Sequence, residues 1–233
     1  MTNSNILHQR HVVITGGTGA LGGAVVEAFV GAGATCHVPV FGPTAGQAPA
    51  SDRVLLVANV DLTTEPAVEA FYAALPPLWA SVHLAGGFAA SPITETSLAD
   101  LTRQLDMNLV TAFLCCREAV KRFRSAGTGG GRIVNVGSRA ADVPAKGMAA
   151  YTASKAAVAA LTRALAEEVR SEGILVNAVL PSIIDTPANR AAMPKANFDK
   201  WPKPTEIART ILWLASPENT LTSGALIPVY GNG

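Results

Sequence analysis

The sequence predicts an α/β fold built on one doubly wound parallel sheet of about seven strands, with helices on both faces. Three observations lead to this class. Short β-branched runs recur along the whole chain, stretches of helical periodicity separate most of them, and the runs are apolar on both faces. At 233 residues and 49% hydrophobic content, the chain suits a single domain, residues 1–233. Right-handed crossovers between sequential strands then make the sheet Rossmann-like.

The expected strands are short runs rich in Val, Ile and Thr that end near Gly, Pro or Asp. In chain order they are His11–Thr15, Thr35–Phe41, Arg53–Val60, Ser81–Leu84, Arg132–Val136, Ile174–Leu180 and Ala225–Val229. The expected helices repeat apolar residues with a period near 3.6. They are Leu21–Val30, Glu65–Ala74, Leu98–Phe123, Tyr151–Glu172 and Thr205–Ala215.

Three segments interrupt the alternation of strands and helices. Gly42–Asp52 has two prolines and no helical period, so it predicts a loop where a crossover helix would be expected. Ser125–Gly131 is glycine-rich and predicts a tight connection before a strand. Pro187–Pro204 follows the carboxyl end of a strand, where ligands bind in such sheets, and predicts a short substrate lid.

The composition excludes several classes of protein. The 18 Lys and Arg residues balance 17 Asp and Glu residues, and no basic block marks a nucleic-acid partner. No apolar run is long enough for a membrane helix, and Met1–Arg10 lacks the apolar core of a secretory signal, so we expect a cytoplasmic location. The three cysteines and four histidines share no metal-ligand spacing. We therefore expect no metal site, and reduced packing roles for Cys36, Cys115 and Cys116.

A glycine-rich turn joins the first strand to the first helix, in the run HVVITGGTGALG. Gly16, Gly19 and Gly22 stand three residues apart. Without Cβ atoms they permit a tight turn and let a pyrophosphate approach the backbone at the helix N-terminus. The same glycines could instead serve only as a structural turn between strand and helix.

The end of the second strand carries no charge that would select a cofactor. A carboxylate there usually holds the ribose hydroxyls of NAD, and cations there accept the 2′-phosphate of NADP. This strand ends in Val40 and Phe41, and Arg53 on the following strand is the nearest cation. The cofactor is therefore predicted as NAD or NADP, with a preference below about tenfold, or 1.4 kcal/mol.

Tyr151 and Lys155 stand four residues apart at the start of a periodic helix and share one face. A nearby ammonium favours a phenolate, so we expect Lys155 to lower the pKa of Tyr151 toward neutrality. Ser138 ends a strand at the carboxyl edge of the sheet, where its hydroxyl could donate to a substrate oxygen. Asn108 lies within an apolar helix, where a lone amide is costly unless it is hydrogen-bonded.

Together with the glycine turn, these residues resemble the short-chain dehydrogenase/reductase superfamily from about His11 to Gly233. The blocks GGGRIVNVGS, YTASK, VNAVLPSIIDT, TEIARTILWLAS and SGALIPVYGNG are similar to family blocks in order and spacing. The resemblance implies a catalytic tetrad of Asn108, Ser138, Tyr151 and Lys155, with Asn108 fixing a local helix distortion. It also implies that the cofactor would be bound by the tetrad members Tyr151 and Lys155 and by Gly16, Thr18, Gly19, Leu21, Gly22, Asp61, Leu62, Ala85, Gly86, Pro181, Ile184 and Thr186.

The sequence departs from the family pattern at three motifs. Ala20 stands at a glycine of the commoner turn, His83-Leu84-Ala85-Gly86 replaces Asn-Asn-Ala-Gly, and Pro181-Ser182 replaces Pro-Gly. The glycine turn, AGGF at Ala85–Phe88 and the Pro-rich lid resemble the quinonoid dihydropteridine reductases of the same superfamily. That branch lacks the serine that this chain has at position 138.

The resemblance implies an NAD(P)-dependent oxidoreductase that transfers a hydride between nicotinamide and a small carbonyl or alcohol substrate. One alternative is reduction of a quinonoid pterin or a similar heterocycle. An alternative of another class is a non-catalytic sensor or scaffold that binds the cofactor. The resemblance also implies a homodimer or homotetramer formed through Leu98–Phe123 and Tyr151–Glu172, which carry more apolar residues than surface helices need.

Overall fold

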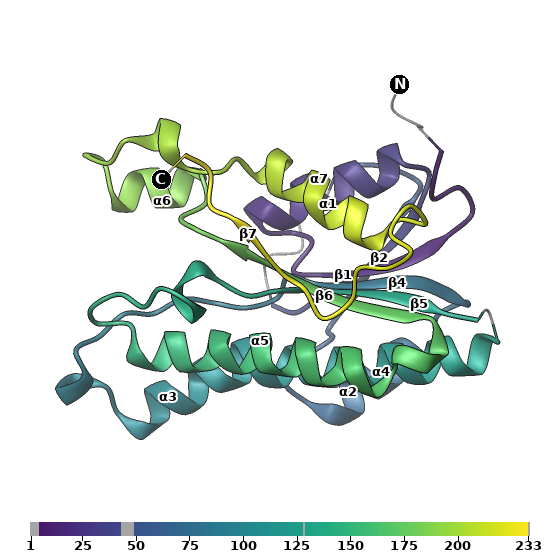
Figure 1. The fold of residues 1–233 in the computed structure, drawn as a ribbon, viewed down its shortest axis with the longest axis horizontal. Coiled ribbons are helices and arrows are strands. Elements are labelled where there is room, and N and C mark those ends of the chain that lie inside the picture. Colours follow the sequence, from purple (N-terminus) through teal and green to yellow (C-terminus); the bar gives the residue numbers. More distant parts are fainter. Residues whose placement is uncertain (1–4, 43–48, 128, 233) are drawn as a thin grey trace.

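The computed structural model describes residues 5–42, 49–127 and 129–232. Within them, seven parallel strands form one sheet in the order β3-β2-β1-β4-β5-β6-β7, which confirms the predicted fold (Figure 1). The strands are β1 (His11–Thr15), β2 (Thr35–Val40), β3 (Val54–Ala58), β4 (Leu78–His83), β5 (Gly131–Val136), β6 (Ile174–Pro181) and β7 (Leu226–Val229).

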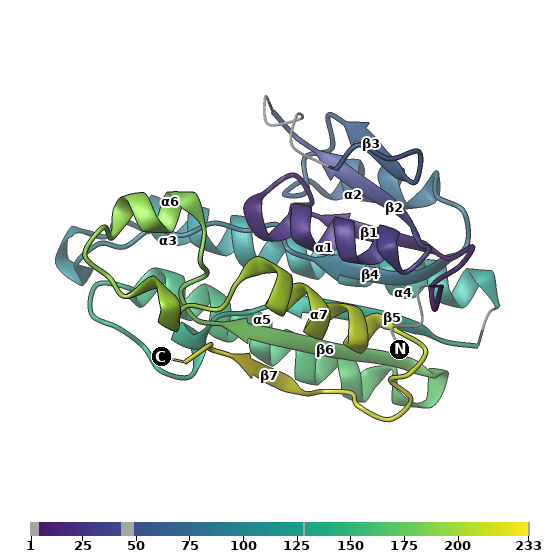
Figure 2. The same ribbon diagram turned by 90° about the horizontal axis from the view of Figure 1, so that it is seen from above.

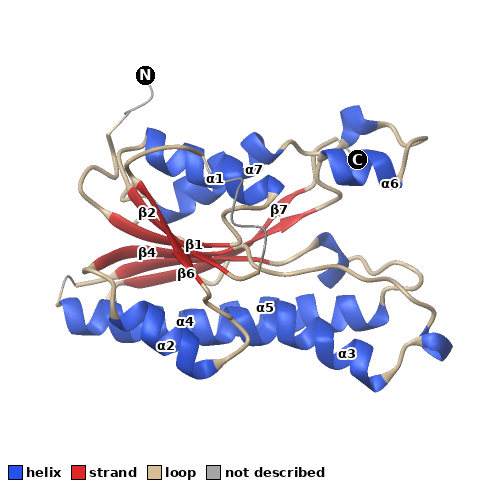
Figure 3. Cartoon of the chain, turned by 180° about the vertical axis from the view of Figure 1, so that it is seen from behind, coloured by secondary structure: helices blue, strands red, loops and turns tan. Residues whose placement is uncertain are grey.

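Helices cover both faces of this sheet, as Figures 1 and 3 show. The α-helices are α1 (Ala20–Gly31), α2 (Glu65–Ala73), α3 (Leu98–Leu105), α4 (Thr111–Ala126), α5 (Ala149–Glu168), α6 (Pro187–Ala192) and α7 (Pro204–Ala215). Helices α1 and α7 pack on one face, where Phe29, Ile207 and Ile211 enter the core. Helices α2 and α4 pack on the other face and bury Phe71, Tyr72 and Phe123.

The strand order reverses beside β1, which lies between β2 and β4. Figure 2 shows the parallel strands side by side from above. Chain segments leaving β1 and β4 therefore part toward opposite faces of the sheet and leave a crevice at the carboxyl ends of these strands. The predicted functional residues Gly16 and Ala85 follow those two strands.

Several predicted boundaries shift in the structure. Strand β4 begins at Leu78 rather than Ser81, and the Pro-rich lid contains the short helix α6. The helix expected over Leu98–Phe123 is divided by a π-helical turn at Asp106–Val110. Between β2 and β3, residues 41–42 and 49–53 form no helix, while 43–48 of the predicted loop lie outside the described residues.

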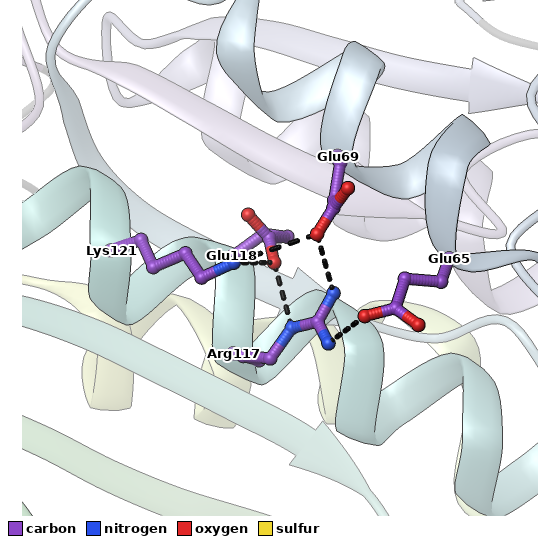
Figure 4. A network of polar contacts seen from close by, with 5 residues as sticks. All are labelled: Glu65, Glu69, Arg117, Glu118 and Lys121. Carbon is purple, nitrogen blue, oxygen red and sulfur yellow. Dashed lines mark hydrogen bonds and ion pairs between the residues drawn. The ribbon is translucent and has the colours of Figure 1, made fainter.

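An ion-pair network joins α2 to α4 on the outer side of one helix layer (Figure 4). Arg117 donates to Glu65, to Glu69 at 3.1 Å and to Glu118 at 2.7 Å. Lys121 Nζ lies 2.8 Å from the Glu118 carboxylate. The Glu118 side chain is only 8% exposed, so two cations compensate a carboxylate that is largely withdrawn from water. This network fixes α4, which carries the π-helical turn at its N-terminal end.

Candidate active site

The glycine turn between β1 and α1 leaves no room for a side chain at Gly16 or Gly22. Gly16 has a φ of +65°, and a Cβ there would lie 2.8 Å from the backbone nitrogen of Ala85. A Cβ on Gly22 would lie 2.0 Å from the carbonyl oxygen of Gly16. Gly19 caps the helix in an extended conformation, so the first turn of α1 follows directly. The first N–H groups of a helix have no partners within the helix and can bind an anion.

A groove of about 1100 Å³ opens over this turn at the carboxyl ends of β1, β2 and β4. Many of the predicted cofactor residues line it: Gly16, Thr18, Gly19, Leu21, Gly22, Asp61, Leu62, Ala85 and Gly86. The groove has the volume of a site for a cofactor-sized molecule. The glycine cradle and the helix N-terminus therefore fit a dinucleotide.

The groove also has lining residues that the sequence analysis did not assign to the cofactor. They are Ala20, Pro39, Val40, Phe41, Val60, Thr63, Leu84, Met107 and Thr111. The end of β2 could have been predicted as part of the cofactor site, because β2 lies beside β1 and ligands gather at the carboxyl edge of such sheets. Met107 gave no signal in the sequence, since its contact with the groove depends on how α3 and the π-helical turn pack on the β4 loop.

The groove end at β2 is apolar, as the sequence predicts. Val40 and Phe41 line it, and Phe41 is 62% exposed. Arg53 lies elsewhere, because it precedes the amino end of β3 and its carbonyl oxygen accepts a hydrogen bond from Cys36 N at 2.8 Å. Cys36 and Val40 are four steps apart along β2, which at about 3.3 Å per residue is roughly 13 Å. Arg53 is therefore wrong as the candidate cation for cofactor choice.

Asp61 is held in place by its own loop. Its Oδ1 accepts from Thr63 N at 2.9 Å and from Thr63 Oγ1 at 2.7 Å. These bonds fix the carboxylate in the groove wall between the ends of β2 and β3. The turn also presents Leu62 and Thr63 to the groove.

Asn108 occupies the π-helical turn, and its side chain holds the loop that follows β4. The Asn108 amide nitrogen donates to Gly87 O at 3.1 Å, and its oxygen accepts from Gly87 N at 3.1 Å. The same nitrogen lies within hydrogen-bonding distance of Gln104 Oε1 and of Ser154 Oγ, each 3.2 Å away. Asn108 is 1% exposed, so these contacts meet the requirement for a buried amide. The helix distortion implied by the resemblance is present at this residue.

Ser138, Tyr151 and Lys155 come together beyond the carboxyl end of β5. Ser138 follows β5 directly, and its hydroxyl lies close enough to the Tyr151 phenol to lower the pKa of that phenol. Lys155 is 7% exposed, and its Nζ donates to the carbonyl oxygen of Val136 at 2.9 Å. A Cβ on Gly86 would lie 2.5 Å from Asn108 Oδ1 and 3.4 Å from Lys155 Nζ. Asn108 and Lys155 therefore lie next to Gly86 in the groove wall, while none of the four predicted tetrad residues is itself among the residues that line the groove.

Burial dominates the protonation of this cluster. It raises the pKa of Tyr151 above its ordinary value, and the hydrogen bond with Ser138 offsets only part of that rise. Burial also lowers the pKa of Lys155 to about 8. The prediction of a lowered Tyr151 pKa is wrong for this geometry, because removing the phenolate from water outweighs the groups that stabilise it.

Three further predicted residues follow β6. Pro181 ends the strand, and Ile184 packs against the core. Thr186 caps α6, and its Oγ1 accepts from Asn189 N at 3.2 Å. Asn189 in turn donates to Ile184 O at 2.7 Å, so the start of the lid is fixed by its own side chains.

The remainder of the lid is joined to the C-terminal segment. Asn232 N donates to Lys200 O at 3.0 Å, and a Cβ on Gly231 would lie 2.5 Å from the same oxygen. Ser182 Oγ donates to Tyr230 O at 2.8 Å. The chain end therefore supports both ends of the segment that follows β6.

The cysteines and histidines lie away from this site. Cys36, Cys115 and Cys116 are buried free thiols, and burial raises the pKa of each. His83 is buried between Ser81 and Asn135. In the described part of the chain, three or more potential ligands do not gather in a metal-binding cluster. No helix within the described residues combines the length and apolar character needed to cross a membrane.

Comparisons with known proteins agree with this geometry. The family model for short chain dehydrogenase matches residues 10–197. The chain is 31% identical to 3-beta-hydroxysteroid dehydrogenase from Comamonas testosteroni, over 95% of this chain and 94% of that protein. It is 30% identical to 2,5-dichloro-2,5-cyclohexadiene-1,4-diol dehydrogenase from Sphingobium indicum, over 97% of each chain.

A solved structure shares the fold at similar coverage. The short-chain type dehydrogenase/reductase from Mycobacterium ulcerans superposes with a TM-score of 0.85 and 25% identity, over 97% of this chain and 90% of that one. The matched segment includes the glycine turn and the tetrad residues. The similarity to dihydropteridine reductases remains a prediction. The chain is an oxidoreductase and belongs to the short-chain dehydrogenase family.

Proposed function

We propose that the protein transfers a hydride between NAD or NADP and a secondary alcohol or its ketone. The observation that carries this proposal is the buried ammonium of Lys155, held at the end of β5 by the carbonyl oxygen of Val136, on the helix that brings Tyr151 next to Ser138. Two hydroxyl groups then converge at the carboxyl edge of the sheet, where a substrate oxygen could receive both. The bound nicotinamide would supply or accept the hydride.

Each polar residue of the cluster has a distinct part in this proposal. Tyr151 gives the proton to the developing alkoxide, and Ser138 donates a hydrogen bond to the same oxygen as it gains charge. Lys155 holds the ribose hydroxyls of the nicotinamide half and stabilises negative charge on Tyr151 when the proton leaves. Asn108 fixes the loop after β4 through its hydrogen bond with Gly87. Burial raises the pKa of Tyr151, so its phenol carries a proton at neutral pH and can act as the donor in ketone reduction.

The cofactor is held along the groove by the glycine turn and the loops after β3 and β4. Pro181, Ile184 and Thr186 are proposed to contact the carboxamide end. Among the described residues that line the groove, Val40 and Phe41 offer no charge at the end of β2, and the nearby Asp61 carboxylate is bound by Thr63, so we propose that neither cofactor is strongly penalised. We expect NAD and NADP to bind within about tenfold of each other.

Two relatives suggest the kind of substrate. The names of the proteins from Comamonas testosteroni and Sphingobium indicum both place the reacting hydroxyl on a ring. We propose a secondary alcohol or ketone on a carbocyclic ring for this chain as well. The lid that begins at α6 would close over such a substrate.

The test is a panel assay of the purified protein. Oxidation of NADH and NADPH is followed with cyclic ketones, acyclic ketones and a quinonoid dihydropterin, and the reverse reaction with the matching alcohols. Turnover of ketones that disappears in Tyr151→Phe supports the proposal. Turnover of the pterin alone, or no turnover of any substrate with either cofactor, overturns it.

A further inference from the structure

An exposed aromatic ring stands beside the proposed proton donor. Phe88 contacts Tyr151 edge to face, with ring centroids 4.9 Å apart and planes at 85°. Phe88 is nevertheless 58% exposed. A large apolar side chain that packs against a reacting tyrosine and still leaves most of its surface in water has a face available for a ligand.

The backbone next to Phe88 is fixed by hydrogen bonds to a buried side chain. Asn108 binds the N–H and the carbonyl oxygen of Gly87, the residue immediately before Phe88. Asn108 also contacts Ser154 Oγ, which donates to the carbonyl oxygen of Tyr151 at 2.8 Å. One buried amide therefore links the segment that carries Phe88 to the helix that carries Tyr151. The relative placement of the two rings is built into the structure.

The surrounding loops present further apolar side chains. Ile93, Val143 and Ile183 follow β4, β5 and β6, and they are 71%, 53% and 44% exposed. The first two loops are joined where Ser91 N donates to Gly147 O at 2.8 Å. These loops lie at the carboxyl end of the sheet, the end that carries Ser138 (Figures 1 and 2).

From this arrangement we propose that Phe88 binds the hydrocarbon ring of the substrate and thereby selects uncharged carbocyclic ketones and alcohols over open-chain ones. The inference rests on the proposed function, because it places the reacting oxygen at Tyr151 and Ser138. A ring packed on Phe88 next to Tyr151 keeps its carbonyl carbon close to the donors. An open chain of the same carbon number covers less of the aromatic face and loses more conformational freedom on binding.

The test compares two ketones with equal numbers of carbon atoms, cyclohexanone and 2-hexanone, in the wild type and in Phe88→Ala. We expect the wild type to prefer cyclohexanone. In Phe88→Ala, kcat/KM for cyclohexanone should fall about five- to tenfold, while that for 2-hexanone changes less than about twofold. The loss should be in KM, because the contact is present in both the bound ground state and the transition state.

Two further variants separate ring binding from loss of structure. Phe88→Leu keeps an apolar side chain without a flat face, so it should retain the fold and still lose part of the preference for the ring. Leu221→Ala removes another apolar side chain, which is 90% exposed and lies before β7. This control variant should change kcat/KM for neither ketone.

The outcomes also separate this inference from the proposed function. Ketone turnover with an equal effect of Phe88→Ala on both ketones, or with no effect on either, overturns the role of Phe88 and leaves the proposed reaction intact. A wild-type protein that prefers 2-hexanone likewise overturns the role of Phe88 and leaves the proposed reaction intact. The absence of all ketone and alcohol turnover overturns both.

Discussion

The α-carbon of Gly22 faces the carbonyl oxygen of Gly16 so closely that a Cβ on Gly22 would lie 2.0 Å from that oxygen. Because the opposing atom belongs to the backbone, Gly22→Ala must displace α1 from the turn. We expect a loss of about 1–3 kcal/mol in the free energy of unfolding and loss of nucleotide binding. Gly31→Ala, in the same helix with open space around it, is the control and should stabilise the protein by about 0.5–1 kcal/mol. Nucleotide titration and denaturant unfolding measure both effects, and retained binding in Gly22→Ala would refute the assignment of this turn.

Tyr151→Phe removes the proposed proton donor and little packing. Turnover should collapse while nucleotide affinity remains close to that of the wild type. Lys155→Ala should reduce both, since Lys155 is proposed to hold the ribose. Tyr72→Phe is a matched control: it removes a buried hydroxyl that is 2.8 Å from Ser81 Oγ, so it should cost about 1 kcal/mol of stability and spare turnover. Near wild-type turnover in Tyr151→Phe would show that another group donates the proton.

Ser138→Ala tests how charge is stabilised on the substrate oxygen. Removing one preorganised donor to a developing oxyanion costs on the order of 10²–10³ in rate. We expect a loss of this size in kcat for ketone reduction. A quinonoid pterin spreads its charge over the ring, so its reduction, if present, should be nearly unaffected. A Ser138→Ala enzyme that reduces ketones at the wild-type rate would contradict the role given to this hydroxyl.

Stability should depend on pH through two buried histidines. Burial lowers the pKa of His83 to about 4, and burial together with His11 lowers the pKa of His37 to about 4. Both values lie below the unfolded value of about 6.5, so on acidification the unfolded chain binds protons first. The free energy of unfolding should be greatest above about pH 6.5 and fall between about pH 6.5 and 4.

The variant His83→Asn isolates one of these histidines. It replaces the titrating ring by an amide, so the decline in stability between pH 6.5 and 4 should become shallower. His8→Asn makes the same chemical change at an exposed position and serves as the control. Urea unfolding at several pH values measures the slope. An equal slope in His83→Asn and the wild type would mean that His83 does not remain neutral in the fold.

The oligomeric state tests the exposed faces of α4 and α5. Among the apolar residues of these two helices, Cys116 and Val158 are 1% exposed and pack inside the subunit. Phe113 is 49% exposed and remains available on α4. We expect light scattering to report a dimer or tetramer at micromolar concentration, and Phe113→Asp to shift it toward the monomer. A mass of 24.0 kDa for the wild type would refute the prediction.

The sequence by itself determined the class of fold and predicted most residues of the candidate site. Periodicity located the strands and helices, because burial on both faces of a parallel sheet imposes continuous apolar runs. The spacing of Gly16, Gly19 and Gly22 predicted the turn, since only glycine fits at Gly16 and Gly22, where backbone approaches backbone. Tyr151 and Lys155 lie on one helix, so their relation could also be predicted from local geometry.

The tertiary structure alone decided what depends on distant segments. Arg53 directly precedes β3 and lies at the opposite end of the sheet from Val40, because parallel pairing places the amino end of β3 beside the amino end of β2. The direction of the Tyr151 pKa shift depends on how deeply the folded loops bury the phenol. The contact between Phe88 and Tyr151 joins the loop after β4 to helix α5, and Asn108 on a third element links the two. Side-chain burial and pairing across the fold are collective properties of packing, and no local pattern in the sequence records them.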